Sequence, residues 1–357
     1  MNLPPEEGTP ALPGKNSRRR VRAKIILTIL CGLGAGILAC EFLSRRFLPQ
    51  FRLPRLAEEF RMGGDPLSPK RFSPSPDLGW EDRDASPPPD AFGFRSLHSA
   101  TTAKAPNEVR ILVLGDSVGK QIFSCPADYE QAEGELSLAW GKPVKLWSFA
   151  VEGYNLDQYE RILRYRAASV SADQVLILFC LNDVALQFVP VVFEHEGRLL
   201  MLQGIVKSPP RAVSPFLFRH SHLYRAGWTF RNAYLYRKRF MPAQTFDSFL
   251  EERHRAFQNT VAWCRQREID FSAVIFPYFK PRDRYDREER ASYASLRDWL
   301  SAAQAPVLDL HDKFSVDDLR AAHNQDPTDD VHPNPSGYRK AREFILAFLK
   351  AHPLSNK

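Results

Sequence analysis

The sequence predicts an α/β domain built on a parallel sheet with helices on both faces, preceded by a helix that spans a membrane. Short apolar runs alternate with longer segments of helical spacing, and polar motifs fall where the apolar runs end, which predicts the domain. An uncharged apolar segment behind a basic N-terminus predicts the membrane helix.

The apolar segment covers residues 25–40 without a charge and extends to residue 43 across Glu41. As a helix the shorter run would be ~24 Å long, less than the ~30 Å hydrocarbon core of a bilayer, whereas the longer one allows a tilted span. Basic residues within the N-terminal region 1–24 favour a cytoplasmic N-terminus. The preferred interpretation is a single-pass signal anchor at 25–43. A lipoprotein signal ending at Cys40 and a buried core helix are the alternatives.

Basic residues are unevenly placed along this chain of net charge +7. They cluster on both sides of the apolar segment, and residues 198–246 hold nine arginines and lysines but no acidic residue. Such patches suit phosphate-bearing surfaces, either lipid headgroups or nucleic acid. An anchor would place the later residues outside the cytoplasm, so we expect a membrane surface and no nucleic-acid partner.

A linker and then a single α/β domain are expected after the anchor. Residues 44–106 are rich in Pro, Ser and Asp and lack periodicity, which predicts a linker that is most ordered near 91–95. The domain should cover 107–350. Its expected strands are 109–114, 144–149, 174–180, 271–276 and 306–310, and its expected helices lie around 156–163, 246–267, 288–303 and 335–351. Ligands of such sheets bind beyond the carboxyl ends of the strands.

A basic and aromatic insertion over residues 184–242 interrupts this alternation. Helical spacing fits parts of 221–240, so an amphipathic cap over the site or on a membrane surface is one interpretation. An ordinary cap, with core aromatics and solvated arginines, is the slightly preferred alternative.

The first motif with chemical potential is Leu114-Gly-Asp-Ser-Val-Gly-Lys120, at the junction of a strand and a helix. Ser117 would sit on the first helical turn, with an exposed hydroxyl among free backbone N–H groups. The alternatives are a serine that only caps the helix and a phosphate-binding loop. The second alternative lacks one residue between Gly115 and Gly119, and Gln121 replaces the magnesium-binding hydroxyl.

The second motif is Asp329-Asp-Val-His332, just before the last helix. Asp329 and His332 can lie on one turn, so that the carboxylate orients the imidazole and leaves its other nitrogen to act as a base. A solvated loop histidine or half of a metal site are the alternatives. The sequence has no other ligand cluster and only five scattered cysteines, which argues against a metal site.

Two further motifs offer hydrogen-bond donors for an oxyanion. Gly153 and Asn182 each follow an expected strand, and together with the Ser117 N–H they can supply a backbone and a side-chain donor. Each is weak alone, because Gly and Asn are ordinary turn residues.

Together the four segments resemble the SGNH (GDSL) hydrolase family, in the correct order and over roughly residues 91–349. The matching residues are Gly115-Asp116-Ser117, Gly153, Asn182-Asp183 and Asp329-x-x-His332. The resemblance implies a flavodoxin-like three-layer α/β/α sandwich, no cofactor or metal, and hydrolysis or transfer of an acyl ester. It implies a triad of Ser117, His332 and Asp329, with Asp116 and Asp183 in support.

Some positions depart from that family or point to a subgroup of it. Ser148 stands where many members carry Asn, and Cys180 stands where Gly is usual near Asn182. The anchor with Glu41 and Arg45, followed by the segment Gly93-Phe-Arg95, looks like bacterial envelope members. We therefore expect the domain to lie in the cell envelope or periplasm.

The function expected from these motifs is a serine esterase that removes acyl groups, such as O-acetyl groups, from an envelope carbohydrate or lipid. The alternatives are an O-acetyltransferase of an envelope polysaccharide, which needs a membrane partner to deliver the acyl group, and a non-catalytic carbohydrate-binding scaffold.

Overall fold

A computed structural model describes residues 15–48, 72–75, 77–82, 86–185, 192–195, 198–201, 215–227, 246–324 and 329–354. The chain divides into two compact units. The N-terminal unit comprises residues 1–59 and 216–234, and the α/β unit comprises residues 60–215 and 235–357. Each unit is described by itself.

The α/β unit is built on five parallel strands in the order β4-β3-β5-β8-β9, whose bounds are β3 Val109–Gly115, β4 Val144–Ala150, β5 Gln174–Phe179, β8 Asp270–Ile275 and β9 Val307–Asp309. All residues of β3 and β5 are buried. Strands covered on both faces need apolar side chains on both sides, which explains the continuous apolar runs in the sequence. The predicted strands are thus confirmed to within about two residues, the usual uncertainty of such bounds.

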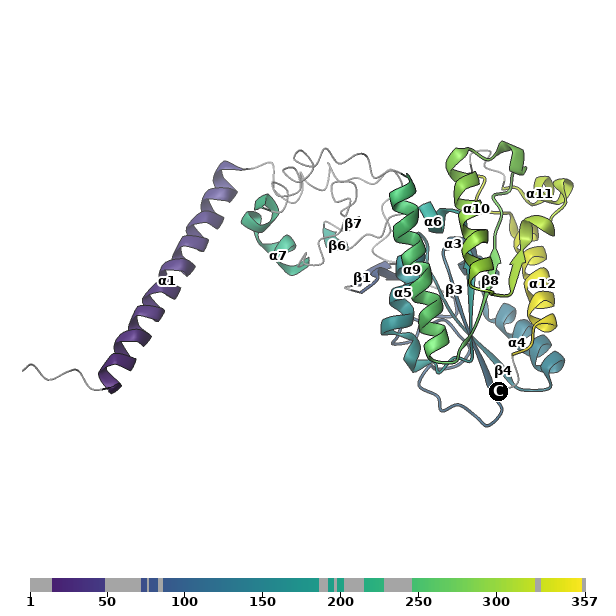
Figure 1. The fold of residues 1–357 in the computed structure, drawn as a ribbon, viewed down its shortest axis with the longest axis horizontal. Helices are drawn as coiled ribbons and strands as arrows, with labels where there is room; N and C mark the ends of the chain where they lie inside the picture. Colours follow the sequence, from purple (N-terminus) through teal and green to yellow (C-terminus); the bar gives the residue numbers. More distant parts are fainter. Residues whose placement is uncertain are drawn as a thin grey trace, which may run out of the picture. The chain divides into compact units, whose positions relative to one another are not determined.

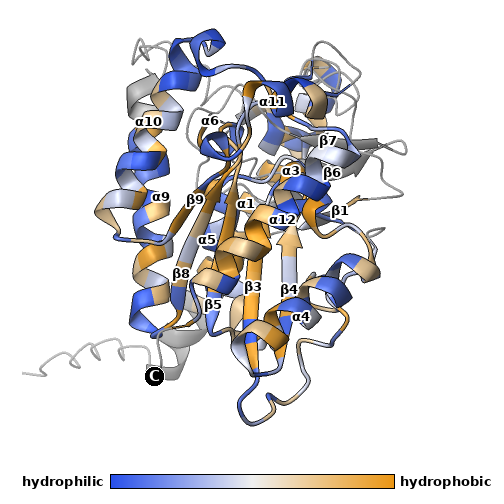
Figure 2. Cartoon of the chain, turned by 90° about the vertical axis from the view of Figure 1, so that its right-hand side faces the viewer, coloured by the Kyte–Doolittle hydropathy of each residue, from blue (hydrophilic) through white to orange (hydrophobic). Residues whose placement is uncertain are grey.

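Helices cover both faces of this sheet, which confirms the predicted three-layer sandwich (Figure 1). On one side α5 (Leu156–Tyr165) packs against α9 (Phe246–Gln266), and α9 packs against α10 (Arg287–Ala302). On the other side α12 (Pro335–Ala351) packs against α3 (Ser117–Ile122), α4 (Pro126–Trp140) and α11 (Val316–Ala322). Figure 2 shows hydrophobic strands enclosed by helices of mixed hydropathy.

Helix α4 is absent from the predicted elements, because its apolar residues are not confined to one face. Tyr129, Ala132 and Leu136 are buried at helical spacing, whereas Leu138 on the same helix is 87% exposed. Pro126 occupies its first turn, where a missing N–H is tolerated, and Gly141 ends it at φ 63°.

A β-hairpin lies within residues 44–106, which corrects the prediction of a linker without regular structure. Its strands are β1 (Phe72–Ser75) and β2 (Gly79–Asp82), paired antiparallel. Trp80 of β2 is buried, and its Nε1 donates to the Glu152 carbonyl at 3.0 Å. Tyr154 in turn donates its hydroxyl to the Trp80 carbonyl. Contacts distant in sequence therefore stabilise two strands that are too short and polar to be recognised from their own residues.

Shorter elements are also present among the described residues of the α/β unit. They are α6 (Asn182–Ala185), the antiparallel pair β6 (Val192–His195) and β7 (Arg198–Met201), and single turns of 3₁₀-helix at Ala167–Ser169, Arg282–Arg284 and Leu310–Asp312.

The N-terminal unit contains α1 (Lys15–Phe47) and a segment of the predicted insertion. Residues Ala23–Phe47 of α1 are long and apolar enough to cross a membrane, which suits an anchor and a signal sequence equally. From the insertion, the unit includes most of α7 (Pro215–His220) and a helical segment at residues 222–227. The aromatic residues predicted at 228–240 lie outside the described residues.

Candidate active site

Ser117 is the first residue of α3, directly after the carboxyl end of β3. Asp116, not Ser117, caps this helix, because the Asp116 carboxylate accepts hydrogen bonds from the backbone N–H groups of Val118 at 2.8 Å and Gly119 at 3.4 Å. The interpretation of Ser117 as a simple cap is therefore wrong. Its hydroxyl is partly buried and available for another partner.

His332 supplies that partner. Its Nε2 lies 2.8 Å from the Ser117 Oγ, and its Nδ1 lies 3.0 Å from each carboxylate oxygen of Asp329. With Nδ1 protonated and bound to the carboxylate, Nε2 carries a lone pair that can accept the Ser117 proton. The structure thus brings Ser117 together with Asp329 and His332, which lie more than two hundred positions further along the chain.

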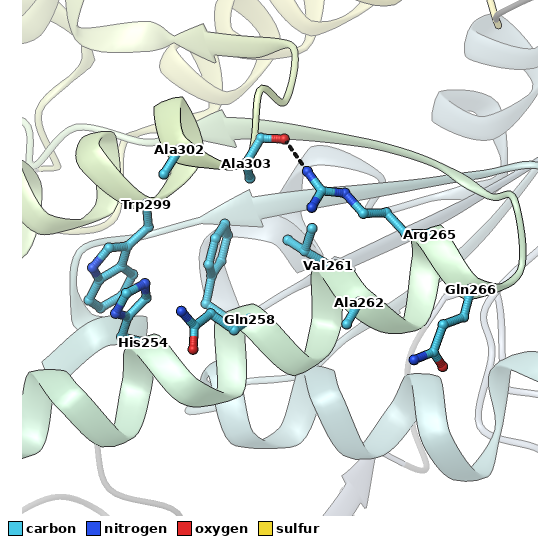
Figure 3. A pocket seen from close by; sticks show the side chains of 10 residues that line it. His254, Gln258, Val261, Ala262, Arg265, Gln266, Trp299, Ala302 and Ala303 are labelled. Atoms are coloured by element: carbon cyan, nitrogen blue, oxygen red, sulfur yellow. Dashed lines mark hydrogen bonds between the residues drawn. The ribbon is translucent and has the colours of Figure 1, made fainter.

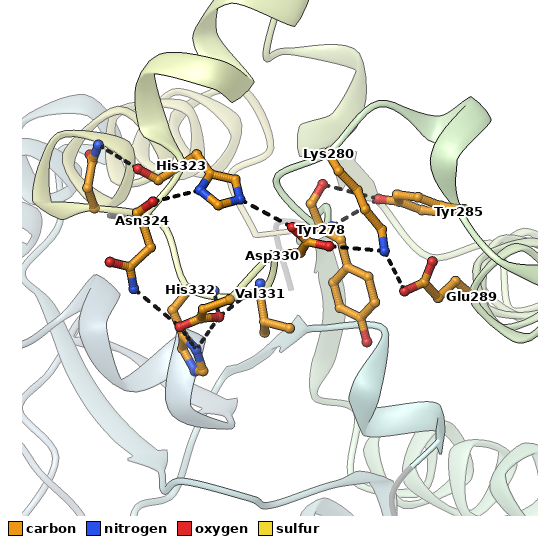
Figure 4. Close-up of polar contacts among 11 residues, drawn as sticks. Tyr278, Lys280, Tyr285, Glu289, His323, Asn324, Asp330, Val331 and His332 are labelled. Carbon is orange, nitrogen blue, oxygen red and sulfur yellow. Dashed lines mark hydrogen bonds and ion pairs between the residues drawn. The ribbon is translucent and has the colours of Figure 1, made fainter. Parts of the chain in front are cut away.

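Asp329 is held in place by several hydrogen-bond donors. The backbone N–H groups of Val331 and His332 bind its Oδ1 at 3.1 Å and 3.0 Å, and the Asn324 side-chain amide binds its Oδ2 at 3.2 Å (Figure 4). Partial burial alone would raise the pKa of Asp329, but the hydrogen bonds and charge of His332 outweigh it and lower the pKa. Asp329 therefore stays ionised and can orient the imidazole.

Close packing of α11 against the start of α12 fixes the end of the histidine loop. A Cβ atom on Gly337 would lie 2.7 Å from the Cβ of Pro333 and 2.8 Å from the Cβ of Ala322, so only glycine fits there. The Asn334 side chain caps α12 at Gly337 N and also donates to the Ala321 carbonyl at 2.7 Å. The loop is thereby anchored immediately after His332.

Gly153 and Asn182 follow β4 and β5, the two strands that flank β3. The nucleophile candidate and the two proposed donors therefore come from three adjacent strand ends. Gly153 adopts φ 77°, and a Cβ there would lie 3.2 Å from the Trp80 ring. The Asn182 side chain lies near the buried Asp116 carboxyl and partly offsets the rise in its pKa that burial causes.

Two fully buried carboxyl groups, Asp116 and Asp183, support these turns. Asp183 accepts a hydrogen bond from the Cys180 N–H at 2.9 Å and donates its own N–H to the Cys180 carbonyl at 3.0 Å, which closes the turn that presents Asn182. Burial raises the pKa of Asp116, and burial together with the charge of Asp116 raises the pKa of Asp183 well above its usual range. Asp183 therefore holds its proton more tightly than an exposed aspartate.

Lys120, three residues after Ser117, would be a phosphate ligand if the first motif were a phosphate-binding loop. In the structure it is buried and pairs with Asp82 and with Glu152, whose Oε1 lies 3.1 Å away. A lysine engaged by two carboxylates is not presented to a phosphate, so the phosphate-loop alternative is not supported. Lys120 instead ties α3 to the hairpin and to the residue before Gly153.

Arg95 holds the other end of α3. It is buried, its backbone exchanges two hydrogen bonds of 2.8 Å with Ser148, and its guanidinium lies 3.4 Å from the Phe123 carbonyl and 3.5 Å from the Lys120 carbonyl. A cation near the carbonyls at a helix C-terminus is favourable. Motif spacing alone does not reveal such positioning residues, because their partners are distant in sequence.

A second polar network lies on the other side of the histidine loop (Figure 4). The His323 Nε2 lies 3.2 Å from Asp330 Oδ1, and Lys280 Nζ lies 3.2 Å from Asp330 Oδ2 and 2.9 Å from Glu289. The Phe279 N–H binds the Asp330 carbonyl at 2.6 Å. These contacts connect the loop after β8 to the residue next to Asp329.

We expect the stability provided by His323 to be lost as pH rises. The Asn324 carbonyl and the Asp330 carboxylate raise the pKa of His323 in the folded protein. The protonated imidazole therefore stabilises the folded state fully at pH values below about 6.5, the ordinary pKa of histidine. This stabilisation is lost as the pH rises through the higher pKa that His323 has in the folded state. A His323→Gln variant should unfold more easily than wild type, by at most ~1 kcal/mol, near pH 6. Thermal unfolding near pH 8 should show a smaller difference; an equal difference at both pH values would contradict this role.

Apart from this site, a pocket of about 450 Å³ lies between α9 and α10. Figure 3 shows its wall, where the His254 ring stacks on Trp299 with centroids 4.9 Å apart. None of the proposed site residues lines it. Within the described ranges, no group of three His, Cys, Asp or Glu side chains is arranged to hold a metal ion.

Similar proteins are found among solved structures, whereas no curated protein matches the chain. The chain is similar to a GDSL-like lipase from Bacteroides thetaiotaomicron (14% identity, TM-score 0.39, covering 71% of this chain and 94% of the other). It is also similar to a catalytic mutant of an acetylxylan esterase from Geobacillus stearothermophilus (11% identity, TM-score 0.41, 69% and 96%).

The family comparison covers most of the α/β unit. Residues 113–340 match the model of the GDSL-like Lipase/Acylhydrolase family, a range that begins in β3 and ends in α12 and includes every proposed site residue. The resemblance inferred from the four motifs is confirmed: the chain belongs to the GDSL-like lipase/acylhydrolase family.

Proposed function

We propose that the protein is a serine esterase, with Ser117 as nucleophile, His332 as general base and Asp329 as the group that orients it. The observation that carries this proposal is the 2.8 Å contact between Ser117 Oγ and His332 Nε2, with His332 Nδ1 held at 3.0 Å by Asp329. These three residues have the arrangement of a catalytic triad, in which a base activates the serine nucleophile and a carboxylate orients the base.

In the proposed mechanism, His332 takes the Ser117 proton as Oγ attacks the ester carbonyl. The tetrahedral oxyanion is stabilised by the backbone N–H groups of Ser117 and Gly153 and by the Asn182 amide. His332 then protonates the departing alcohol, leaving an acyl group on Ser117. A water molecule, deprotonated by His332, attacks this acyl-enzyme, and the carboxylic acid leaves as Ser117 recovers its proton.

We further propose that α1 anchors the protein in a membrane, with the α/β unit on the outer side of the cytoplasmic membrane. The 25-residue apolar span Ala23–Phe47 and the basic residues before it support this orientation. An enzyme in this place would meet acylated carbohydrates and lipids of the cell envelope. We therefore propose O-acyl groups, such as O-acetyl esters, as the substrate class.

Asn182→Ala is expected to lower kcat for a short aryl acetate by about 10²–10³-fold with little change in KM, because one oxyanion donor would be lost in the transition state only. Steady-state kinetics would measure this. Asn259→Ala is a matched control, since Asn259 is exposed on α9, where its side-chain amide donates to Glu160 at 3.1 Å. An unchanged kcat in Asn182→Ala would exclude Asn182 from the oxyanion site.

A further inference from the structure

The acidic residue Glu41 lies near the C-terminal end of α1, within the apolar span Ala23–Phe47. It is the single acidic residue of that span. Carboxylates are costly inside or close to a bilayer, so an acidic residue in a membrane helix needs specific partners. The structure identifies those partners in a segment about 180 positions further along the chain.

The partners are the donors at the start of the helical segment 222–227. The His222 and Leu223 N–H groups bind the two carboxylate oxygens of Glu41 at 2.8 and 2.9 Å, and the Ser221 hydroxyl binds Oε2 at 2.8 Å. The Tyr224 N–H is satisfied by the Ser221 hydroxyl at 3.0 Å. Glu41 thus caps the first turn of a helix from another part of the chain, where a negative charge is favourable.

Further hydrogen bonds join the same two segments. Arg45 donates to Glu41 at 2.7 Å and to the His220 carbonyl at 3.0 Å, so it connects α1 to the end of α7. The His222 ring lies 2.7 Å from the Leu48 carbonyl, and the side chains of Ser44 and His222 are buried in this contact. Figure 1 shows α7 beside the C-terminal end of α1. We call this set of contacts the Glu41 clamp.

Large apolar side chains remain exposed around the clamp, on both segments that it joins. They are Phe42 (70%), Leu43 (49%), Phe47 (68%), Phe216 (68%) and Leu217 (42%). Exposed arginines accompany them: the side chain of Arg45 is 59% exposed, and the Arg46 guanidinium lies 5.8 Å from the Phe47 ring centroid. Aromatic and aliphatic groups beside arginines at the end of an apolar span are typical of a segment at a membrane interface.

We propose that residues 216–227 lie at the membrane interface, where the Glu41 clamp holds them against α1 and where Phe216 and Leu217 contact phospholipid. The chain would then leave the bilayer after α1 and return to its surface through the insertion. Lipid is favoured as the occupant because α7, which Arg45 joins to the end of the apolar span, exposes Phe216 and Leu217. The exposed Arg45 and Arg46 also suit headgroup phosphates. Residues 216–227 are in this respect the part of the insertion that belongs to the N-terminal unit and lies at the membrane.

This inference rests on the proposed placement of α1 in a membrane. It can be tested with the full chain in vesicles of phosphatidylethanolamine and phosphatidylglycerol, carrying a nitroxide spin label on Phe216→Cys. Cys31, Cys40 and Cys125 would be replaced by alanine, whereas Cys180 and Cys264 are buried, and burial raises the pKa of both thiols, so they should not react. The readout is the ratio of label collisions with oxygen, which dissolves in lipid, to collisions with a water-soluble nickel chelate.

The control position is Leu138, which is 87% exposed on α4 of the α/β unit. With Glu41 unchanged in this cysteine-substituted background, the collision ratio at 216 should exceed that at 138 several-fold. Glu41→Ala should lower the ratio at 216 toward the value at 138, and Glu41→Gln, which keeps an acceptor oxygen, should lower it less. Hydrolysis of a soluble aryl acetate should be unchanged in both variants, because Glu41 lies outside the proposed catalytic machinery.

Three outcomes would overturn the inference. A water-like ratio at 216 in vesicles that retain the protein after carbonate washing would show that the segment does not contact lipid, while leaving the proposed anchor and esterase intact. A lipid-like ratio that Glu41→Ala leaves unchanged would show that the clamp does not hold the segment there. Release of the protein by carbonate would exclude both the anchor and this inference, without bearing on aryl acetate hydrolysis.

Discussion

Replacing Ser117 with alanine is expected to lower the turnover of a short aryl acetate by about 10⁴-fold or more, as removal of a triad nucleophile does in serine hydrolases. The alanine side chain cannot form the acyl-enzyme, and His332 would lose the hydroxyl that now lies 2.8 Å from its Nε2. The fold should persist, because Asp116 rather than Ser117 caps α3. Steady-state kinetics and circular dichroism of the same samples would measure both effects.

Ser301→Ala provides the matched control for this substitution. Ser301 is an exposed residue of α10, and the substitution removes the same hydroxyl group from a helix outside the proposed site. Its turnover should equal that of wild type. A folded Ser117→Ala variant with wild-type turnover would exclude Ser117 as the nucleophile.

Replacing Lys120 with methionine is expected to destabilise the α/β unit by about 3–5 kcal/mol, the usual cost of removing one partner from a buried ion pair. Lys120 is the cation between Asp82 and Glu152, and its side chain is 7% exposed. Without it, the buried Asp82 carboxylate and the partly exposed Glu152 carboxylate would lose the cation that lies between them. Thermal unfolding should show a midpoint lower by roughly 10 °C for a unit of this size.

Two further variants test the reason for this loss. Lys142→Met changes an exposed lysine and should leave the unfolding midpoint within error of wild type. Adding Glu152→Gln to Lys120→Met should recover part of the lost stability, because one of the two carboxylates that lose their contact with Lys120 is then removed. Equal stability of Lys120→Met and wild type would contradict the ion-pair account.

Residues whose pattern is local were predictable from the sequence. The strands β3 and β5 are mainly apolar and buried at every position, and β4 and β8 are mainly apolar with a few polar residues, so their approximate bounds follow from composition. Parallel strands place their carboxyl ends at one edge of the sheet, so the positions of Ser117, Gly153 and Asn182 after three such runs are enough to assign them to one site.

Features that depend on distant partners were not predictable. The hairpin β1–β2 is short and polar, and it is stabilised by contacts of Trp80 with Glu152 and Tyr154. The packing role of Lys120 depends in the same way on Asp82, a residue within the predicted linker. Such elements are defined by tertiary contacts, and a single sequence carries no periodic signal for them.

The proposed mechanism depends most on the identity of the nucleophile, and covalent labelling tests it most directly. The full-length protein would be treated with a fluorophosphonate and digested, and the modified peptide would be identified by mass spectrometry. We predict a single phosphonylated residue, Ser117, and no modification in His332→Ala, because the base that activates the hydroxyl would be absent. Modification of another serine, or none in a folded wild-type protein, would contradict the proposed mechanism.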